Sequence, residues 1–232
     1  PPMRPLHYMP LAPACRAARV ALAEKRLDFT LVPERGWDLP DAFFELNPAG
    51  TLPVLVESSG LVVPGALLIA EYLEEAYSAH APGEAPNPQI LPSTAAERVE
   101  ARRLAHWFEF KFATEVSDPL VYEKIDRRFM GAGPPDMNVV RQALQALRPH
   151  LSYLNFLADA RRWLAGDTFT IADISAAAHL SALDYMGDMP WHDYEAVKLW
   201  YARVKSRPSF RPLLADHIAG MPPPRHYADL DF

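Results

Sequence analysis

One cysteine in the chain stands where thiol chemistry can begin. Cys15 follows Ala12-Pro13-Ala14, directly after a short apolar stretch, so it lies at the start of an expected helix. A helix dipole there favours the thiolate, which is the nucleophilic form of cysteine. Cys15 is therefore a candidate redox or conjugating thiol. An unpaired cysteine more often behaves as a small buried hydrophobe, and we favour this second interpretation.

The cysteine and histidine content restricts other site chemistry. A single cysteine cannot form an internal disulfide, and the eight histidines show no paired spacing of the kind that binds zinc. We therefore expect no metal site and a reducing, cytoplasmic location. The first residues show no basic segment followed by an apolar stretch, so no secretory signal is expected. No apolar run approaches the roughly 20 residues that span a membrane.

The charge balance excludes two classes of partner. The 232 residues include 23 Lys and Arg against 29 Asp and Glu, which gives a formal net charge of -6. A field of this sign repels the polyanionic surfaces of nucleic acids and anionic lipids. We expect neither nucleic-acid binding nor membrane insertion, and a protein partner must be bound through a local patch.

Trp37 and the last twelve residues are candidate contact sites for a protein partner. Trp37 lies in a polar loop, where an aromatic side chain serves either dimer packing or partner binding. Three prolines at 222–224 favour an extended conformation that projects the following residues from the body. The alternative is that this tail folds back on the preceding domain. The candidate contact residues in the tail are Tyr227, Asp229, Leu230, Asp231 and Phe232.

The first third of the chain predicts a mixed α/β scaffold. Short apolar runs bounded by proline, glycine or asparagine indicate strands, and apolar residues at helical spacing indicate helices. Strands are expected over residues 6–9, 29–32, 51–57 and 61–63, with helices over 14–26 and 66–77. The turn at 58–60 makes the last two strands a hairpin.

The composition changes after a proline-rich stretch, and the rest of the chain predicts helices. They are expected over residues 94–113, 138–160, 171–185 and 194–205. The expected organisation is an α/β domain at 1–80, a linker at 81–92, an all-α domain at 93–220 and a tail at 221–232. Each domain has a size that suits an independent core.

The order of these elements resembles that of the cytosolic glutathione S-transferases over residues 4–215. Four motifs carry the resemblance: LNPAGTLPVL at 46–55, RAARVALAEK at 16–25, FTIADI at 169–174, and the helical residues 200–210. The resemblance implies a thioredoxin-like first domain and an all-α second domain. It further implies a cis peptide bond before Pro53 and a capping box formed by Thr170 and Asp173.

The resemblance also locates the family's glutathione site, and there this sequence departs from the family. The hydroxyl or thiol that stabilises the glutathione thiolate is replaced by Ala12, which cannot donate a hydrogen bond. The acidic residue and serine that hold the γ-glutamyl carboxylate are replaced by Pro64 and Gly65. Leu52 and Pro53 keep the family pattern. The resemblance therefore implies a degenerate site, and we expect no glutathione binding.

These departures and the acidic, aromatic tail resemble the glutathione S-transferase-like bacterial division factors that bind FtsZ, the tubulin-like filament protein. This resemblance implies a non-catalytic homodimer that acts at the division site, where it curves or bundles FtsZ filaments and promotes constriction. A two-fold particle with two binding surfaces can bridge filaments without any new contact.

Two rival functions remain open. The first is a glutathione-dependent transferase or thiol oxidoreductase that activates glutathione with Cys15 or a backbone amide. The second is a carrier that binds a small ligand in the cleft between the domains without turnover.

Overall fold

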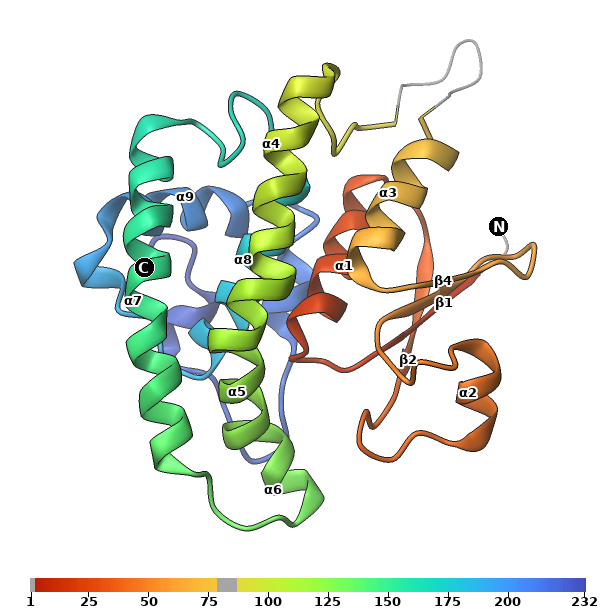
Figure 1. The fold of residues 1–232 in the computed structure, drawn as a ribbon, viewed down its shortest axis with the longest axis horizontal. Helices are drawn as coiled ribbons and strands as arrows, with labels where there is room; N and C mark the ends of the chain where they lie inside the picture. The colour runs from red at the N-terminus through yellow and green to blue at the C-terminus, as the bar shows by residue number, and fades with distance from the viewer. Residues whose placement is uncertain (1–2, 79–86) are drawn as a thin grey trace.

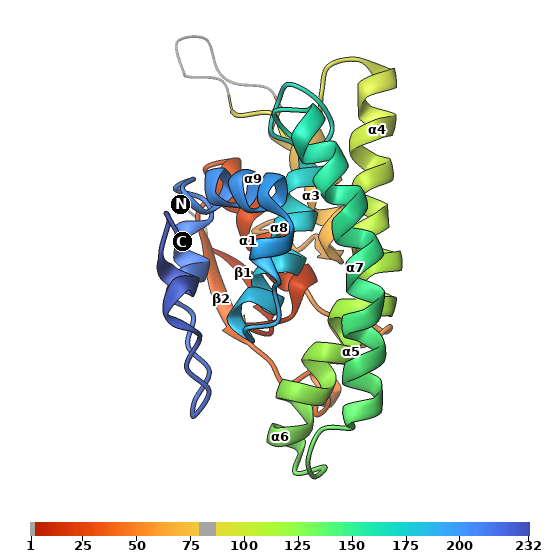
Figure 2. The same cartoon turned by 90° about the vertical axis from the view of Figure 1, so that its left-hand side faces the viewer.

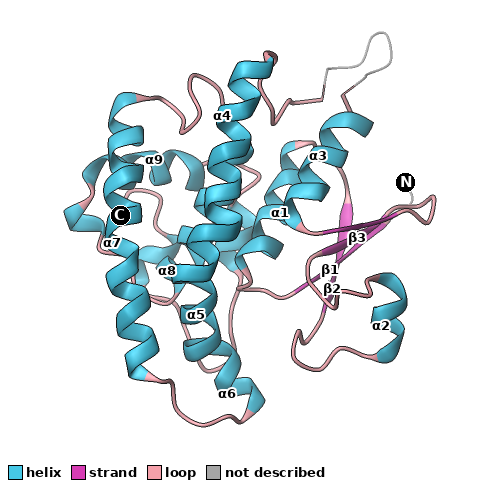
Figure 3. Cartoon of the chain, in the orientation of Figure 1, coloured by secondary structure: helices cyan, strands magenta, loops and turns pink. Residues whose placement is uncertain are grey.

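The structure is a computed structural model that describes residues 3–78 and 87–232. A four-stranded sheet with its helices forms the first part, and the second part is helical (Figure 1). Figure 3 shows that the strands of the described chain all belong to the first part. The prediction of an α/β thioredoxin-like domain followed by an all-α domain is confirmed.

The sheet is mixed and has the strand order β2-β1-β3-β4. Its strands are β1 (Arg4–Tyr8), β2 (Phe29–Pro33), β3 (Val54–Val56) and β4 (Val62–Pro64). β1 runs parallel to β2, whereas β3 is antiparallel to both β1 and β4. The parallel pair requires a crossover, and the helix after β1 provides it.

The helices of the first domain are α1 (Pro13–Glu24), α2 (Asp41–Leu46) and α3 (Ala66–Ala76). α1 begins with Pro13, whose missing amide hydrogen would have no partner in the first turn. Its buried alanines allow close packing against α3 and the second domain. The sequence reading missed α2, because its six residues are too few to show a helical period.

The second domain begins with one long helical stretch. It comprises α4 (Ala95–His106), a π-helical segment (Trp107–Ser117), α5 (Asp118–Val121), a second π-helical segment (Tyr122–Asp126) and α6 (Arg127–Met130). The sequence predicted an end at residue 113, so the prediction was 17 residues too short. Pro119 sits in the first turn of α5, where the wide π turns before it have already shifted the hydrogen-bond pattern.

Three further helices complete this domain: α7 (Met137–Ala160), α8 (Ile171–Tyr185) and α9 (Glu195–Lys205). All 15 residues of α8 are buried, so this helix is the centre of the molecule. The predicted capping box is present: the Thr170 amide donates to Asp173 Oδ2 at 3.0 Å, and the Ala172 amide donates to Thr170 Oγ1 at 3.2 Å. The Asp173 carboxylate also accepts from Trp200 Nε1 at 2.8 Å.

The two domains share one continuous hydrophobic core, which differs from the independent cores expected from their sizes. α1 packs between α3 and α8, so buried residues of the sheet and of the helical domain are in contact (Figure 1). Polar side chains add to this junction. Arg16 Nε donates to Ser181 Oγ at 2.8 Å, and Arg207 forms a bidentate pair with Glu24 at 2.6 and 2.9 Å.

The expected linker is only partly described, because residues 79–86 lie outside the described ranges. The peptide bond between Leu52 and Pro53 is cis, as expected. Within residues 3–78 and 87–232, no helix has the length and apolar character needed to cross a membrane.

Candidate functional site: a junction pocket and a docked tail

The turn between β1 and α1 places Ala12 at the junction of the two domains. Ala12 is the residue that precedes α1, and no side chain caps this helix end. Its half-buried methyl group lines a pocket, but it carries no donor for a thiolate. The position that the family resemblance assigns to thiol activation therefore lines a pocket with a side chain that cannot donate a hydrogen bond.

Cys15 lies one turn further along α1 and is completely buried. Burial raises the pKa of the Cys15 thiol to about 12, so the thiolate is a negligible fraction at neutral pH. The sulfur accepts a hydrogen bond from the Met9 amide at 3.4 Å. This environment fits the small buried hydrophobe and does not support the redox or conjugating thiol.

The start of α3 also lacks the side chains that hold glutathione in the family. Pro64 ends β4, and Gly65 precedes α3 with a φ of 88°, a conformation that favours glycine. The Gly65 amide donates to the Pro53 carbonyl at 2.8 Å, so this group is already occupied. Leu52 is half-buried beside this turn. The five positions of the predicted degenerate glutathione site thus carry neither a side-chain hydrogen-bond donor nor an acid.

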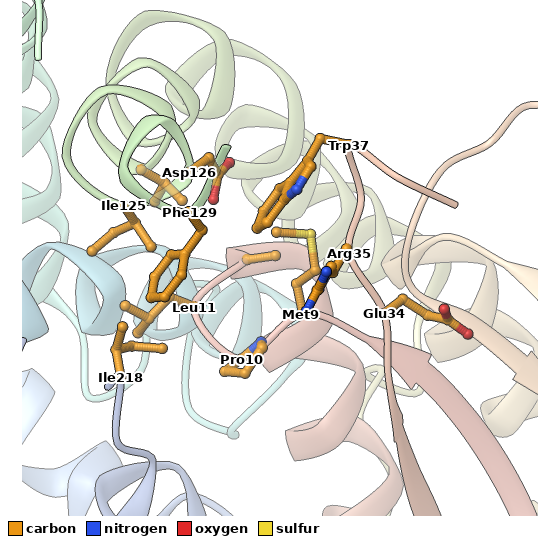
Figure 4. Close-up of a pocket in the computed structure, with 12 residues that line it drawn as sticks. Met9, Pro10, Leu11, Glu34, Arg35, Trp37, Ile125, Asp126, Phe129 and Ile218 are labelled. Carbon is orange, nitrogen blue, oxygen red and sulfur yellow. The ribbon is translucent and has the colours of Figure 1, made fainter. Parts of the chain in front are cut away.

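The pocket beside Ala12 has a volume of about 380 Å³ and is mainly apolar. Met9, Leu11 and Trp37 line it from the first domain, and Ile218 lines it from the segment after α9 (Figure 4). The sequence placed Trp37 in a polar loop and left its role open. Trp37 is half-buried against this pocket, so part of its ring is available to a ligand or partner.

The other wall of the pocket consists of residues that the sequence reading missed. Val121, Ile125, Asp126 and Phe129 all belong to the long helical stretch beyond residue 113. Val121, Ile125 and Phe129 recur every four residues, which is a helical spacing, and this pattern was the available signal. Asp126 is the acidic side chain of that wall, and burial together with the charge of Asp118 raises its pKa to about 6.

The tail folds back on the second domain, which was the alternative interpretation of its sequence. It runs along the side of α8 opposite to α4 and α7 (Figure 2). Tyr227 is fully buried, so the expectation that it is an exposed contact residue was wrong. Its hydroxyl accepts a hydrogen bond from Arg16 and donates to the Leu213 carbonyl at 3.0 Å.

Phe232 is also packed rather than free. Its ring contacts Trp191 and Tyr201 with centroid separations of 5.0 and 6.0 Å, and Lys205 Nζ lies 4.0 Å from its centroid. Lys205 Nζ further donates to the backbone carbonyl of Asp229 at 2.5 Å. The three prolines do not project the tail, because these aromatic and backbone contacts hold it against α8 and α9.

Three candidate contact residues remain accessible in the docked tail. The side chains of Asp229 and Asp231 are exposed, and Leu230 is half-buried. Trp37 lines the junction pocket, whereas none of the tail residues does, so the structure does not bring the two candidate contact sites together in one pocket. Among the described residues, no group of three or more His, Cys, Asp or Glu side chains is arranged to hold a metal ion.

Two family models and several known proteins match the sequence of this chain. The model of the glutathione S-transferase N-terminal domain matches residues 12–76, and that of the C-terminal domain matches residues 137–203. The chain is 47% identical over 232 residues to FtsZ-localized protein A of Caulobacter vibrioides, covering 99% of this chain and 98% of that protein. It is 30% identical over 227 residues to glutathione S-transferase 3 of Zea mays, covering 94% and 96%.

Solved structures also resemble this chain over its full length. The crystal structure of a glutathione S-transferase from Rhodospirillum rubrum is 51% identical with a TM-score of 0.92, covering 99% of this chain and 100% of that one. FzlA from C. crescentus is 47% identical with a TM-score of 0.91, and each chain is covered completely. The sequence matches and the shared architecture together show that this chain belongs to the glutathione S-transferase family.

Proposed function

We propose that this chain is a non-catalytic member of its family that binds FtsZ filaments as a homodimer at the bacterial division site. In this role it curves or bundles the filaments and promotes constriction. The proposal is supported by the full-length similarity to FtsZ-localized protein A and FzlA. The exposed acidic pair Asp229 and Asp231 supplies a local patch for the filament, and Trp37 is a second candidate contact.

The observation that carries the non-catalytic part is the chemistry of the degenerate site. Ala12 has no hydrogen-bond donor in its side chain, and Pro64 and Gly65 have neither a carboxylate nor a hydroxyl for the γ-glutamyl group. Losing charge-assisted contacts at two separate points removes several kcal/mol of ligand affinity. Cys15 does not replace them, because its thiol is buried and protonated.

Calorimetric titration with reduced glutathione tests this part directly. We expect no saturable heat up to millimolar ligand, since the two main side-chain contacts are missing. Micromolar binding would contradict the proposal and would place this chain among the glutathione-using members of the family.

Co-sedimentation with FtsZ filaments tests the contact surface. We expect Asp229→Lys to weaken binding roughly tenfold, because it reverses one charge of an exposed pair. The variant also removes the hydrogen bond that Asp229 Oδ1 accepts from the Asp231 amide, so an unchanged circular dichroism spectrum is the check on folding. Asp159→Lys is the matched control: it makes the same charge change at an exposed position of α7 and should bind like the wild type. Equal binding by both variants and the wild type would reject the tail as the contact surface.

The homodimer is tested by sedimentation velocity and by filament bundling. A dimer offers two contact surfaces and can join neighbouring filaments, so bundling should fall when dimers dissociate on dilution. Single-filament binding with a monomeric mass would contradict the bridging mechanism while leaving the contact surface intact.

Glutathione transfer is the second candidate function, because the relative from Zea mays and the structural neighbour from R. rubrum are both named glutathione S-transferases. Conjugation of glutathione to a chlorodinitrobenzene-type electrophile measures it. Saturable turnover that survives Cys15→Ala would point to activation by a backbone amide, whereas loss of turnover in this variant would implicate the thiol. We expect no turnover in the wild type.

A further inference from the structure

The junction pocket contains one polar group that the fold does not use. Asp126 lines the pocket, and its Oδ1 is shielded from solvent and has no hydrogen-bond partner among the described residues. Figure 4 shows Asp126 on the same helical wall of the pocket as Ile125 and Phe129, with Trp37 contributed by the first domain. A shielded carboxylate oxygen without a donor is costly, so native structures usually satisfy such groups.

Neighbouring charges do not compensate Asp126. Arg127 follows it in the chain, but this guanidinium lies 3.4 Å from Glu123 and donates to the Ala132 carbonyl at 2.8 Å. The charge that acts on Asp126 is that of another acid, Asp118, which disfavours the ionisation of Asp126. Arg35 on the first-domain rim is exposed and forms no ion pair with Asp126 within the described chain. Within the described chain, the Asp126 carboxylate is therefore an uncompensated negative charge in the lining of the pocket.

The walls around this carboxylate are apolar and aromatic. Leu11, Val121, Ile125 and Ile218 supply aliphatic surface, and Trp37 and Phe129 supply two aromatic rings. Glu34 and Arg35 are the other charged residues of the lining. Aromatic faces attract cations, and the attraction grows when water is excluded. A volume of about 380 Å³ lies in the size range of pockets for small organic ligands.

We propose that the junction pocket binds a small organic cation, namely an amine attached to an apolar or aromatic group. The ammonium group would pair with Asp126, and the apolar part would lie against Trp37, Phe129 and the aliphatic wall. This inference does not require FtsZ binding, although Trp37, a candidate filament contact, also lines the pocket. It also differs from glutathione chemistry, which would require an anion-binding site at the start of α3.

Three dansyl compounds with the same fluorophore test the charge preference. Dansylcadaverine carries a primary ammonium, dansylamide is neutral and dansylglycine is anionic. Binding is followed at pH 7.5 by energy transfer from tryptophan to the dansyl group. We expect dansylcadaverine to bind at least about tenfold more tightly than dansylamide, the contribution typical of a hydrogen bond to a charged group. Dansylglycine should bind most weakly.

Three variants locate the effect. Asp126→Asn keeps the shape of the side chain and should remove the tenfold preference while leaving dansylamide binding unchanged. Asp159→Asn, which removes a charge at an exposed position of α7, should retain the preference. Ala12→Leu places a larger side chain in the pocket and should weaken the binding of both probes, with an unchanged circular dichroism spectrum as the check on folding.

Several outcomes would overturn the proposal. Equal affinities for the cationic and neutral probes would show that Asp126 does not select ligands. A preference that survives Asp126→Asn, or binding that survives Ala12→Leu, would place the probe elsewhere. Tighter binding of dansylglycine would assign the pocket to anions through Arg35, and no saturable binding up to millimolar probe would reject a ligand site.

Discussion

At the scale of single residues, position in the fold decides which reactive groups are available. Cys15 is the single thiol of the chain, yet it is sealed inside α1 and its pKa is raised to about 12. Asp126 is an ordinary acid in the sequence, but it lies half-buried beside an apolar pocket without a partner among the described residues. Cys15, whose chemistry is evident from the sequence, is therefore unreactive. Asp126, which the sequence did not single out, carries the uncompensated charge.

Cys15 should resist thiol reagents in the native protein. We expect labelling by an Ellman-type disulfide at pH 8 to be slower than for the unfolded chain by at least a hundredfold, since the thiol is buried and protonated. The time course of thiol release, with and without urea, measures this ratio. Rapid labelling of the native protein would revive the reactive-thiol interpretation.

Asp126→Asn should stabilise the protein in a pH-dependent way. The folded-state pKa of Asp126 is raised from 3.8 to about 6. The contribution of protonated Asp126 to the free energy of unfolding is therefore fully present below pH 4 and is lost as the pH rises through 6. Asparagine does not ionise. The advantage of the variant should therefore be near zero at pH 4 and reach roughly 1 kcal/mol above pH 7, after allowance for partial solvent screening.

Urea unfolding at pH 4, 5, 6 and 7.5 measures this difference in unfolding free energy. Asp159→Asn changes an exposed acid and should show no such trend. A stability difference that is constant with pH, or that has the opposite sign at pH 7.5, would contradict the assigned environment of Asp126.

At the scale of elements, the motifs act through contacts outside their own segments. The capping box that starts α8 uses the Asp173 carboxylate, which also accepts from the Leu164 amide and from Trp200 Nε1. One side chain therefore joins the start of α8 to the preceding loop and to α9. The helix signal in the sequence is local, but the carboxylate stabilises three segments.

The two acids that cap helices should differ in their contribution to stability. Asp173→Ala leaves three buried donors without an acceptor and should cost about 3 kcal/mol or more of unfolding free energy. Asp136→Ala removes an exposed cap of α7, which accepts only from the Asn138 amide at 2.8 Å, and should cost about 1 kcal/mol. Denaturant unfolding measures both, and equal costs would contradict the structural role of Asp173.

At the scale of the whole molecule, α1, α8 and the tail hold the two domains together. Arg16 on α1 is fully buried, and its guanidinium contacts Ser181 on α8, Asp216 in the segment after α9, and Tyr227 in the tail. A buried arginine needs such partners because an unpaired charge is expensive in the interior. The tail is therefore part of the domain junction.

Tyr227→Phe should loosen the tail and weaken this junction. The variant keeps the aromatic packing but removes the hydroxyl between Arg16 and Leu213, which should cost about 1–2 kcal/mol. Urea unfolding and the rate of proteolytic cleavage after residue 221 measure the effect. Tyr194→Phe is the control, since that exposed hydroxyl makes only a 3.4 Å contact with a carbonyl. Identical behaviour of the two variants would contradict the junction role.

The sequence by itself determined the class of fold, the strands and most of the helices, because these depend on local signals such as apolar periodicity. The cis bond before Pro53 and the capping box of Thr170 and Asp173 were implied by the family resemblance, and both are present. The sequence also showed that Ala12, Pro64 and Gly65 lack side chains for glutathione, because a missing functional group is evident from composition alone.

The tertiary structure decided the features that depend on contacts between distant segments. The docked tail requires α8 and α9, with which Tyr227 and Phe232 pack, and no local pattern distinguishes this from a projecting tail. The junction pocket likewise requires Trp37 and Asp126 to meet from opposite domains. Burial and electrostatic pairing are properties of the assembled molecule, so the buried thiol and the uncompensated carboxylate became visible only in the folded chain.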